Sequence, residues 1–496
     1  MNAASLTERT FSAVLWNYAG GFARAIAQLG VQVVLARLLG PHVYGQFTIV
    51  LAVVGLGWFI AESGMGVALV QVRELTNEVI RQALGGMLMQ GALVAVVLII
   101  AAPYLAALFD EPGLTGPLMA CSALVLLQSM SNISSSLLRR QFDMKRLQFI
   151  QVAAYAVGFG GVGITLAALG AGVWSLVGAF ATQSLITWLA AYRLVRHPLR
   201  PLFRMSADLR SYGMKVLGST LASWMADNLE RVVVGRVWGV AALGAYSGAF
   251  GLARAPATLL TYSVQSMSLP IASRLQDDPE RLRRAYCIVA GGLALVLLPV
   301  FSLFAVAAQP LVLLLYGERW NEAVPLLAAC AVAMPFYVLA ANTGTFLWAT
   351  GAAGREAISQ SVLAAILIAG FVLLGSWPLS TAIWIVPAVH ILRAAATYLM
   401  LSRRIELPHG RTLRAMFGGI VLGLVIVFGW EISAWVPKDL GPSTVAVLRL
   451  TFVGGLAMLA VLASRGALIG PELRSVIRGR IPANRAGQFA QRVLGI

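Results

Sequence analysis

The chain has 496 residues, of which 59% are hydrophobic and 11% charged, and its mean hydropathy is +0.81. Soluble domains carry about 25% charged residues, so this composition excludes a water-soluble fold. At roughly 20 apolar residues per span, the chain could cross a membrane more than a dozen times. That leaves no room for a large catalytic domain outside the bilayer.

The charge balance is strongly basic. There are 37 lysines and arginines against 20 aspartates and glutamates, a net charge of +17. In a soluble protein this would suggest a nucleic-acid partner, but in a membrane protein it is typical of cytoplasmic loops. We therefore expect a lipid bilayer and no nucleic acid as the partner of this chain.

The sequence carries no pattern typical of a metal or cofactor site. The three cysteines lie in apolar segments without metal or redox spacing. The four histidines are scattered, and no phosphate-binding GxxxxGK[ST] loop is present. We expect no metal, no cofactor and no ATP hydrolysis. The first apolar stretch contains Arg24 and is too long for a cleavable signal peptide, so it is predicted to be the first span.

Long apolar runs bounded by charges, glycine or proline predict fourteen transmembrane helices. The first seven are Phe11–Leu35, Tyr44–Val70, Ala83–Leu108, Leu118–Leu138, Leu147–Leu169, Val173–Val195 and Tyr212–Val237. The second seven are Tyr246–Leu269, Ala285–Ala308, Val324–Ala349, Ile358–Leu374, Leu379–Leu401, Leu413–Trp435 and Thr444–Ala463.

The distribution of charge orients these spans. With a cytoplasmic N-terminus, 27 of the 37 basic residues fall in cytoplasmic segments. The opposite side keeps only Arg37, Arg319 and Lys438. Because positive charge accumulates on the cytoplasmic side, both termini are predicted to lie in the cytoplasm. The residues after Ala463 are predicted to form a short basic segment at the membrane surface.

The chain repeats itself 199 residues apart. RLLGPHVYG (residues 37–45) and RVWGVAALG (residues 236–244) share the spacing R-x-x-G-x-x-x-x-G. Six spans separate the copies, so both halves would lie the same way up, as in transporters built from two parallel repeats. The sequence predicts an N-terminal six-helix lobe at 1–200 and a second lobe at 201–408. Two further helices at 409–464 and a basic tail at 465–496 follow.

Polar residues inside predicted spans recur at helical spacing. The first span carries Asn17, Arg24, Gln28 and Gln32, and the eighth carries Arg254, Thr258, Thr261 and Gln265. These two stripes are expected to line a polar substrate cavity, although such stripes also hold helices together. Arg24 is the strongest candidate. An arginine at mid-helix costs about 2.5–3.5 kcal/mol to insert, and nothing nearby on its own helix neutralises it.

Acidic residues form a second candidate group. The seventh span carries Ser219, Ser223, Asp227 and Arg231 at four-residue spacing with Glu230 beside them, and the second span carries Glu62. Asp227 and Arg231 can pair on one helix face, which favours a structural ion pair. A carboxylate that couples transport to protons or cations is the alternative for Asp227, Glu230 and Glu62.

Five segments in this order resemble one family: RLLGPHVYGQFTIVLAVVGLG followed by ESGMGVALVQ, SSSLLRRQFDMKRLQFI, GRVWGVAALGAYSGAFGLARAP and GERWNEAVPLL. The family is the Wzx-like polysaccharide-transporter branch of the multidrug/oligosaccharidyl-lipid/polysaccharide exporter superfamily, and the resemblance covers roughly residues 10–465. It implies an all-α fold of two six-helix lobes with pseudo-two-fold symmetry plus two C-terminal helices. Helices one, two, seven and eight would line a cationic cavity.

The resemblance also implies a function, which is translocation of an undecaprenyl-diphosphate-linked oligosaccharide to the periplasmic leaflet. Such a transporter is not an enzyme, and glycan polymerase, chain-length and export proteins are its expected partners. A guanidinium binds diphosphate oxygens in bidentate fashion, so Arg24 and Arg254 would hold the head group.

Three alternatives remain open at this point. The first is a flippase for another polyprenyl-linked glycan, such as a peptidoglycan or teichoic precursor. The second is a multidrug exporter, for which acidic cavity residues would be favoured. The third is a membrane-embedded glycosyltransferase, polymerase or acyltransferase, which usually has a sizeable outer loop. The longest outer loop here, near 309–323, has only about fifteen residues.

Overall fold

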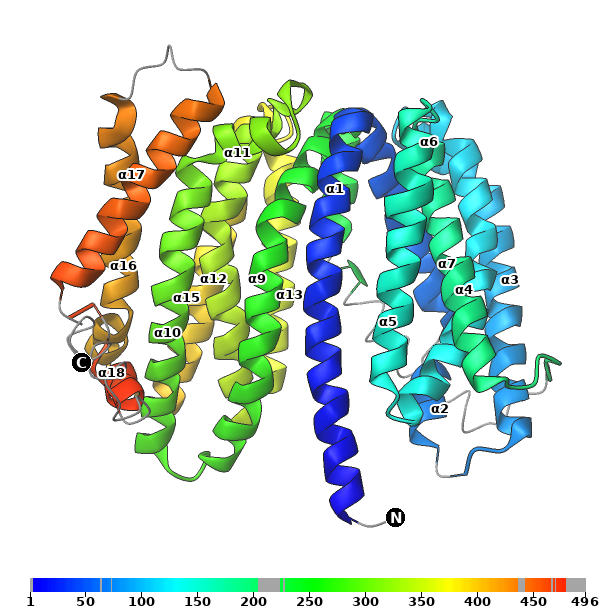
Figure 1. The fold of residues 1–496 in the computed structure, drawn as a ribbon, viewed down its shortest axis with the longest axis horizontal. Coiled ribbons are helices and arrows are strands. Elements are labelled where there is room, and N and C mark those ends of the chain that lie inside the picture. The colour runs from blue at the N-terminus through cyan, green and yellow to red at the C-terminus, as the bar shows by residue number, and fades with distance from the viewer. Residues whose placement is uncertain are drawn as a thin grey trace. The chain divides into compact units, whose positions relative to one another are not determined.

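The computed structural model describes residues 3–62, 65–72, 74–203, 224–225, 228–435, 442–464, 467–468 and 470–478. The described part is a polytopic helical protein with eleven helices long and apolar enough to cross a membrane. This confirms the predicted fold class (Figure 1). Contacts divide the chain into two compact units, Met1–Ser247 and Gly248–Ile496.

The first unit is built around a long, bent helix. Its elements are α1 (Ala3–Glu62), α2 (Met65–Gln71), α3 (Asn77–Leu108), α4 (Thr115–Arg140), α5 (Met144–Tyr155), a π-helical segment (Ala156–Gly163), α6 (Ile164–Ala168), α7 (Val173–Val195), a helix at 228–238 and the beginning of α9 (Val240–Arg274). α1 packs against α3, α4 and α5, and α4 lies between α3 and α7.

The second unit continues α9 and adds α10 (Pro279–Val306), α11 (Ala308–Leu315), α12 (Ala323–Ala349), α13 (Ala353–Leu373), α14 (Leu379–Ala382), α15 (Ile385–Arg404), α16 (His409–Ile432), α17 (Pro442–Ala463) and α18 (Pro471–Arg478). α10 packs against α12 and α16, and α12 packs against α15. Gly419 on α16 lies so close to the Ala294 carbonyl that a side chain there would overlap it. Small residues thus let these helices approach closely.

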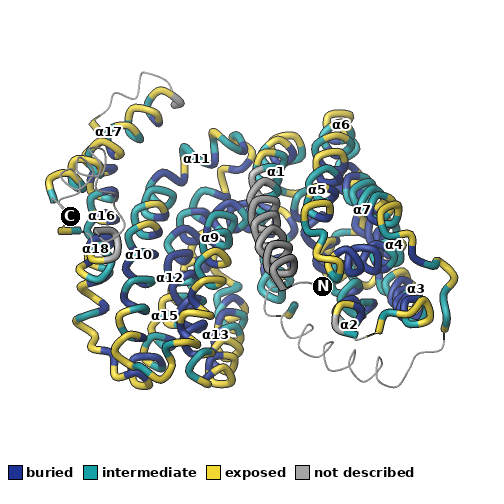
Figure 2. The backbone as a smooth tube through the Cα atoms, turned by 60° about the horizontal axis from the view of Figure 1, so that its bottom comes forward, coloured by how far each residue is buried: buried dark blue, intermediate teal, exposed yellow. Residues whose placement is uncertain are grey.

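Burial follows the pattern expected of a helical bundle in lipid. Figure 2 shows buried positions on the helix sides that face neighbouring helices and exposed positions on the other sides. The exposed side chains include large apolar ones, such as Tyr104 at 75% and Leu373 at 80%. Exposed apolar surface on this scale is stable only against hydrocarbon. All three cysteines are free and buried, as expected.

The predicted spans correspond well to the described helices. The span Val173–Val195 matches α7 at both ends, and the first two predicted spans correspond to the two arms of α1, the second continuing into α2. α1 bends at Gly40, whose φ of 76° is a left-handed conformation that favours glycine, and Pro41 follows directly. The seventh predicted span, Tyr212–Val237, lies largely outside the described residues.

The two copies of the sequence repeat contact each other within the first unit. Gly40 and Gly239, at matching positions of the repeat, both have positive φ. A side chain on Gly45 would overlap the Val240 carbonyl, and one on Gly244 would overlap the Pro41 carbonyl. The contact is therefore reciprocal, as pseudo-two-fold symmetry requires. We call this region the glycine end of the unit.

The loop after α3 binds both copies at the glycine end. Arg236 forms an ion pair with Asp110 at 2.6 Å. Glu111 pairs with His42 at 2.8 Å and accepts a 3.1 Å hydrogen bond from Gln46. Because these residues flank the glycine contact, the loop links the two copies through opposite charges.

Arginines gather at the opposite end of the first unit, which we call the arginine end. Arg140 donates to the carbonyls of Leu69, Val70 and Val72, at the C-terminus of α2. Such carbonyls attract cations. Arg81 donates to the Arg200 carbonyl and its own carbonyl accepts from the Leu202 amide, so the chain after α7 is held on α3. The same end carries the basic segments predicted to be cytoplasmic.

Candidate functional site

A cavity of about 800 Å³ lies inside the first unit and is lined by polar side chains from α1, α4, α5, α7 and the 224–231 region. Its lining extends from Tyr44, near the glycine end, to Arg139, near the arginine end. The cavity therefore runs along the helices over much of their length. A polar cavity inside a membrane protein is costly and marks a path for a polar ligand.

The α1 stripe lines this cavity at the positions where the spacing predicts one face. Arg24, Gln28 and Gln32 all contribute to the lining. Arg24 Nη1 donates a 3.0 Å hydrogen bond to Gln151 Oε1 on α5, next to Tyr155. The partner that Arg24 lacks on its own helix is thus a neutral amide on another helix, and no carboxylate among the described residues forms an ion pair with it. The Asn17 side chain lies outside the described residues.

Two further stripes were missed by the sequence reasoning. α4 contributes Gln128, Ser131, Asn132, Ser135 and Arg139, and α7 contributes Gln183, Ser184 and Thr187. They recur every three or four residues, so the same helical periodicity could have found them. Serine and threonine also bond to their own helix, as Thr187 does to the Gln183 carbonyl, so periodicity alone does not tell a cavity from a helix contact.

The described lining residues include three arginines and no carboxylate: Arg24, Arg139 and Arg231. At about 1.5 Å per residue, Arg231 lies about 12 Å along its helix from Gly239. Arg24 lies about 24 Å from Gly40, and Arg139 lies about 36 Å from Thr115, where α4 begins. The three guanidinium groups therefore sit on different helices at stepped depths between the glycine end and the arginine end.

Glu62 lies at the C-terminal end of α1, beside the arginine-end part of the cavity. It interacts electrostatically with Arg139. Glu62 Oε1, Asn132 Nδ2 and Ser136 Oγ all converge within 3 Å of the point where Gly66 would carry a side chain. The Asn132 side chain bonds to the Glu62 carboxylate, and the Ser136 hydroxyl is buried with no hydrogen-bond partner among the described residues. A carboxylate and two buried polar groups thus share one small space.

The described part of the seventh predicted span includes two of its charged residues, Arg231 and Glu230. Arg231 lines the cavity and lies 3.4 Å from Asn228 Oδ1. Glu230 accepts a 2.9 Å hydrogen bond from the hydroxyl of Tyr246 on α9. Ser219, Ser223 and Asp227 lie outside the described residues, so the Asp227–Arg231 ion pair stays a prediction.

In the second unit, the α9 stripe has mostly local partners. The Thr258 and Thr261 hydroxyls donate to the backbone carbonyls of Arg254 and Ala257 on the same helix, and Gln265 donates to the Ala341 carbonyl on α12. Such bonds are typical of residues that hold helices together.

Arg254 packs against aromatic rings of the same unit. Its guanidinium lies 5.4 Å from the Phe250 ring centroid and 5.9 Å from that of Tyr337. These cation–π contacts stabilise a guanidinium in apolar surroundings. A cavity role for the α9 residues stays a prediction.

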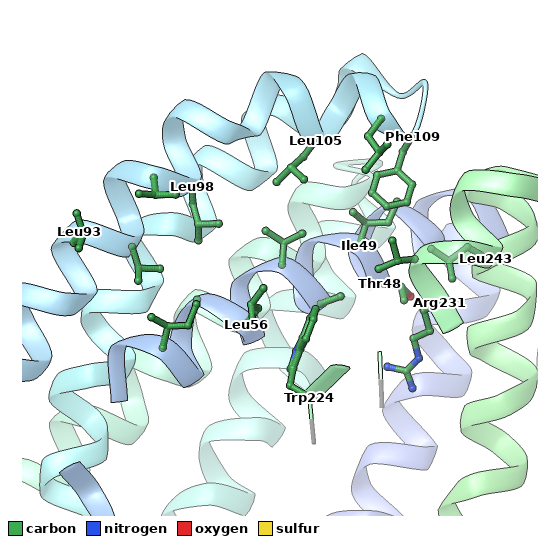
Figure 3. Close-up of a pocket in the computed structure, with 18 residues that line it drawn as sticks. Thr48, Ile49, Leu56, Leu93, Leu98, Leu105, Phe109, Trp224, Arg231 and Leu243 are labelled. Atoms are coloured by element: carbon green, nitrogen blue, oxygen red, sulfur yellow. The ribbon is translucent and has the colours of Figure 1, made fainter. Parts of the chain in front are cut away.

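A second, apolar cavity of about 470 Å³ lies beside the polar one. It is lined mainly by leucine, isoleucine and valine from α1 and α3, and Thr48, Ala52, Trp224 and Arg231 line both cavities. In Figure 3, Leu93 and Leu98 lie toward one end of the apolar cavity and Arg231 toward the other. The first unit thus places apolar and cationic surfaces side by side.

Fold and site together define a polytopic membrane transporter with a cationic cavity in its first unit. The sequence comparison gives the family. Residues 34–325, more than half of the chain, match the family described as polysaccharide biosynthesis protein, and the chain belongs to that family. The predicted resemblance to Wzx-like polysaccharide transporters, and the class of transporter rather than enzyme, are confirmed by this family and by the relatives that follow.

Three curated relatives agree with this assignment. The chain is 27% identical to the succinoglycan biosynthesis transport protein ExoT of Rhizobium meliloti, over 67% of this chain and 72% of that protein. It is 22% identical to the lipopolysaccharide biosynthesis protein WzxC of Escherichia coli, over 66% and 67%. It is 25% identical to the teichuronic acid biosynthesis protein TuaB of Bacillus subtilis, over 59% and 62%.

Solved structures show the same fold. The lipid II flippase MurJ in an inward closed conformation matches with a TM-score of 0.71 at 12% identity, over 91% of this chain and 99% of that one. An inward-facing multidrug resistance MATE family transporter matches with a TM-score of 0.57 at 16% identity, over 79% and 94%. The chain therefore shares its fold with this flippase and with this drug transporter.

Proposed function

We propose that this protein is a flippase that carries an undecaprenyl-diphosphate-linked oligosaccharide from the cytoplasmic to the periplasmic leaflet for exopolysaccharide, capsule or O-antigen synthesis. The observation that carries the proposal is the polar cavity with Arg24, Arg139 and Arg231 and no carboxylate among its described lining residues. Three guanidinium groups attract an anionic diphosphate, and the glutamine and serine side chains offer hydrogen bonds to a glycan.

The stepped depths of the arginines suggest how the head group advances. Arg139 lies near the arginine end, Arg24 deeper, and Arg231 nearest the glycine end. A diphosphate that leaves one guanidinium meets the next about 12 Å further along, so the anion never crosses the full hydrocarbon core without a cation nearby. Transport then consists of short transfers between neighbouring sites in place of one costly step.

The proposal also includes the orientation of the protein in the membrane and the energy source for transport. Both termini lie in the cytoplasm, and the protein resides in the inner membrane. Glu62, Asp227 and Glu230 are the candidates for coupling to protons or cations. Glu62 is the best placed, because it interacts with Arg139, and a diphosphate bound to Arg139 would compete with it. Polysaccharide polymerase, chain-length and export proteins are the expected partners in the membrane.

A multidrug exporter is the second candidate, because a MATE transporter shares the fold. Such exporters take organic cations, and a cation would be repelled by Arg24, Arg139 and Arg231. The cavity chemistry therefore favours an anionic substrate.

Reconstitution tests the proposal directly. Purified protein is placed in liposomes that contain undecaprenyl-diphosphate-linked oligosaccharide, and the glycan exposed outside is oxidised by periodate, which does not cross the bilayer. We expect the protected half to become accessible within minutes with the protein and to stay protected without it. Liposomes loaded with a fluorescent organic cation serve as the comparison. Cation efflux without glycan translocation would replace the flippase proposal with the exporter alternative.

A further inference from the structure

The apolar cavity of the first unit has a shape that the cationic cavity alone does not explain. Its lining on α3 extends from Leu93 to Phe109, about 24 Å along the helix at about 1.5 Å per residue. That is most of the roughly 30 Å thickness of a hydrocarbon core. Leu93 is 66% exposed and Val97 is 54% exposed, and Leu108 toward the other end is 43% exposed, so the cavity is a groove that opens to the surface of the unit toward both ends.

The groove and the polar cavity are continuous. Thr48, Ala52, Trp224 and Arg231 line both, and of these Arg231 brings the positive charge. Away from this junction, the described groove lining is aliphatic or aromatic. A ligand that occupies both spaces at once must have an anionic group at one end, near Arg231, and be purely apolar at the other end.

We propose that the groove between α1 and α3 binds the isoprenoid chain of the lipid-linked substrate, while the diphosphate lies beside Arg231 in the polar cavity. This inference rests on the proposed function and deepens it. A bilayer phospholipid also has an anionic head and apolar tails, but its two tails begin at the same head group. The described groove lining beyond the shared residues is instead one apolar stretch, mainly along α1 and α3, which fits a single long chain.

Gly57 gives the groove its depth. A side chain at this position would come within 3 Å of Val94 Cγ1 and Leu98 Cδ1, so the glycine allows α1 and α3 to approach at the floor. The rims are formed by side chains that contact lipid, including Leu93, Val97 and Leu108. Because the groove reaches nearly from one side of the core to the other, a chain lying in it can follow the head group between leaflets.

Neighbouring valines on α3 provide a matched test. Val97 lines the groove, whereas Val96 does not, and the two are 54% and 53% exposed. A photoreactive p-benzoylphenylalanine is introduced at each position, and the purified proteins are reconstituted with radiolabelled undecaprenyl diphosphate that carries no sugar. We expect Val97→p-benzoylphenylalanine to crosslink to the label, and a tenfold excess of unlabelled undecaprenyl diphosphate to lower the yield at least fivefold. Crosslinking at Val96 should be weak and unaffected by the competitor.

Equal crosslinking at the two positions, or crosslinking at Val97 that the competitor does not lower, would mean that the groove holds ordinary bilayer lipid and would overturn the inference. Transport gives a second readout. Val97→Trp should reduce glycan translocation at least fivefold and Val96→Trp should leave it unchanged, both at normal protein level. Unchanged translocation by Val97→Trp, with an active wild type, rejects the groove and keeps the flippase. An inactive wild type rejects the flippase itself, and the crosslinking result still stands on its own.

Discussion

At the scale of single residues, the position of Arg24 explains why a charge is retained in an apolar helix. Its described hydrogen-bond partner is the Gln151 amide, which satisfies one N–H group without neutralising the charge. A structural ion pair would have supplied a carboxylate. Among the described residues, the guanidinium therefore has no carboxylate to compensate its charge on the cavity surface, which is useful for an anionic ligand and costly otherwise.

This argument predicts opposite effects of Arg24→Ala on stability and transport. The protein should insert at normal or higher level, because the variant removes a charge that costs about 2.5–3.5 kcal/mol in a span. Glycan export in a complemented deletion strain should fall at least tenfold. Arg24→Lys should retain part of the activity, since an ammonium keeps the charge and loses the planar two-pronged donor. Full export by Arg24→Ala at normal level on a blot would show that the head group is held elsewhere.

His197 lies just beyond α7 and is 4% exposed. A carbonyl can only accept, so His197 Nδ1 donates to the Pro198 carbonyl at 3.2 Å. Nε2 lies 3.0 Å from the Ser134 hydroxyl, which donates to it when the ring is neutral. Burial lowers the pKa of His197 below its ordinary value of 6.5, because the charged ring is poorly solvated there.

The lowered pKa makes the folded protein acid-sensitive. Above about pH 6.5 the ring is neutral in both the folded and unfolded states, and its contribution to stability is constant. As the pH falls below 6.5, the unfolded state takes up the proton first, so stability declines until the folded pKa is passed. The melting temperature of the purified protein should therefore drop more between pH 7.5 and 5.5 in the wild type than in His197→Gln. Parallel curves would contradict this assignment.

At the scale of elements, the span Val173–Val195 was predictable to the residue because both ends carry sharp signals, Gly172 before it and Arg196 after it. The break between the first two spans was also predictable, because Gly40 and Pro41 interrupt the apolar run where α1 bends. The packing of the other repeat copy beside this bend was not, because it is a contact between residues about 200 positions apart.

The candidate site was predictable to a similar degree. The α1 stripe was found, because a charged residue and two glutamines on one apolar face have few other uses. The α4 stripe was not, because serines such as Ser129 also bond to their own helix backbone, and only packing decides which serines face the cavity.

The reciprocal glycine contact makes a prediction about both repeat copies. Gly45→Ala and Gly244→Ala each place a methyl group on a backbone carbonyl of the other copy, which cannot move aside as a side chain would. Each should destabilise the protein by about 1–3 kcal/mol. Gly30→Ala is the matched control, since Gly30 lies within α1 and nothing lies within 4 Å of an added side chain. It should be neutral or slightly stabilising.

Thermal unfolding of the three purified variants in one detergent measures these differences. The two damaging changes should resemble each other, because the contact is symmetric. If Gly244→Ala were as stable as the wild type while Gly45→Ala was destabilised, the contact between the two copies would not be symmetric. That result would count against the pseudo-two-fold arrangement.

At the scale of the whole molecule, the basic groups near the predicted cytoplasmic side of each unit bind backbone carbonyls. In the first unit, Arg140 and Arg81 bind backbone carbonyls at the arginine end, and the acidic loop of Asp110 lies at the glycine end. In the second unit, Arg404 binds the Thr350 carbonyl at the C-terminus of α12, and Arg283 binds the Ile405 carbonyl after α15. These basic groups have structural partners as well as a role in orientation.

The final prediction concerns how the chain crosses the membrane. Since 27 of the 37 basic residues fall on one predicted side, that side should be cytoplasmic. Reporter fusions after Arg140, Arg200, Arg284 and Arg404 should fluoresce as green fluorescent protein, which matures only in the cytoplasm. Fusions near Asp110 and Glu318 should be active as alkaline phosphatase, which works only outside. Each site receives both reporters, so that a poorly expressed fusion is not mistaken for a location. Arg200 is decisive, because six spans before it return the chain to its starting side and give the second repeat copy the orientation of the first. Phosphatase activity after Arg200 would leave an odd number of spans before it, invert one copy, and exclude the parallel repeat on which the two-lobe arrangement depends.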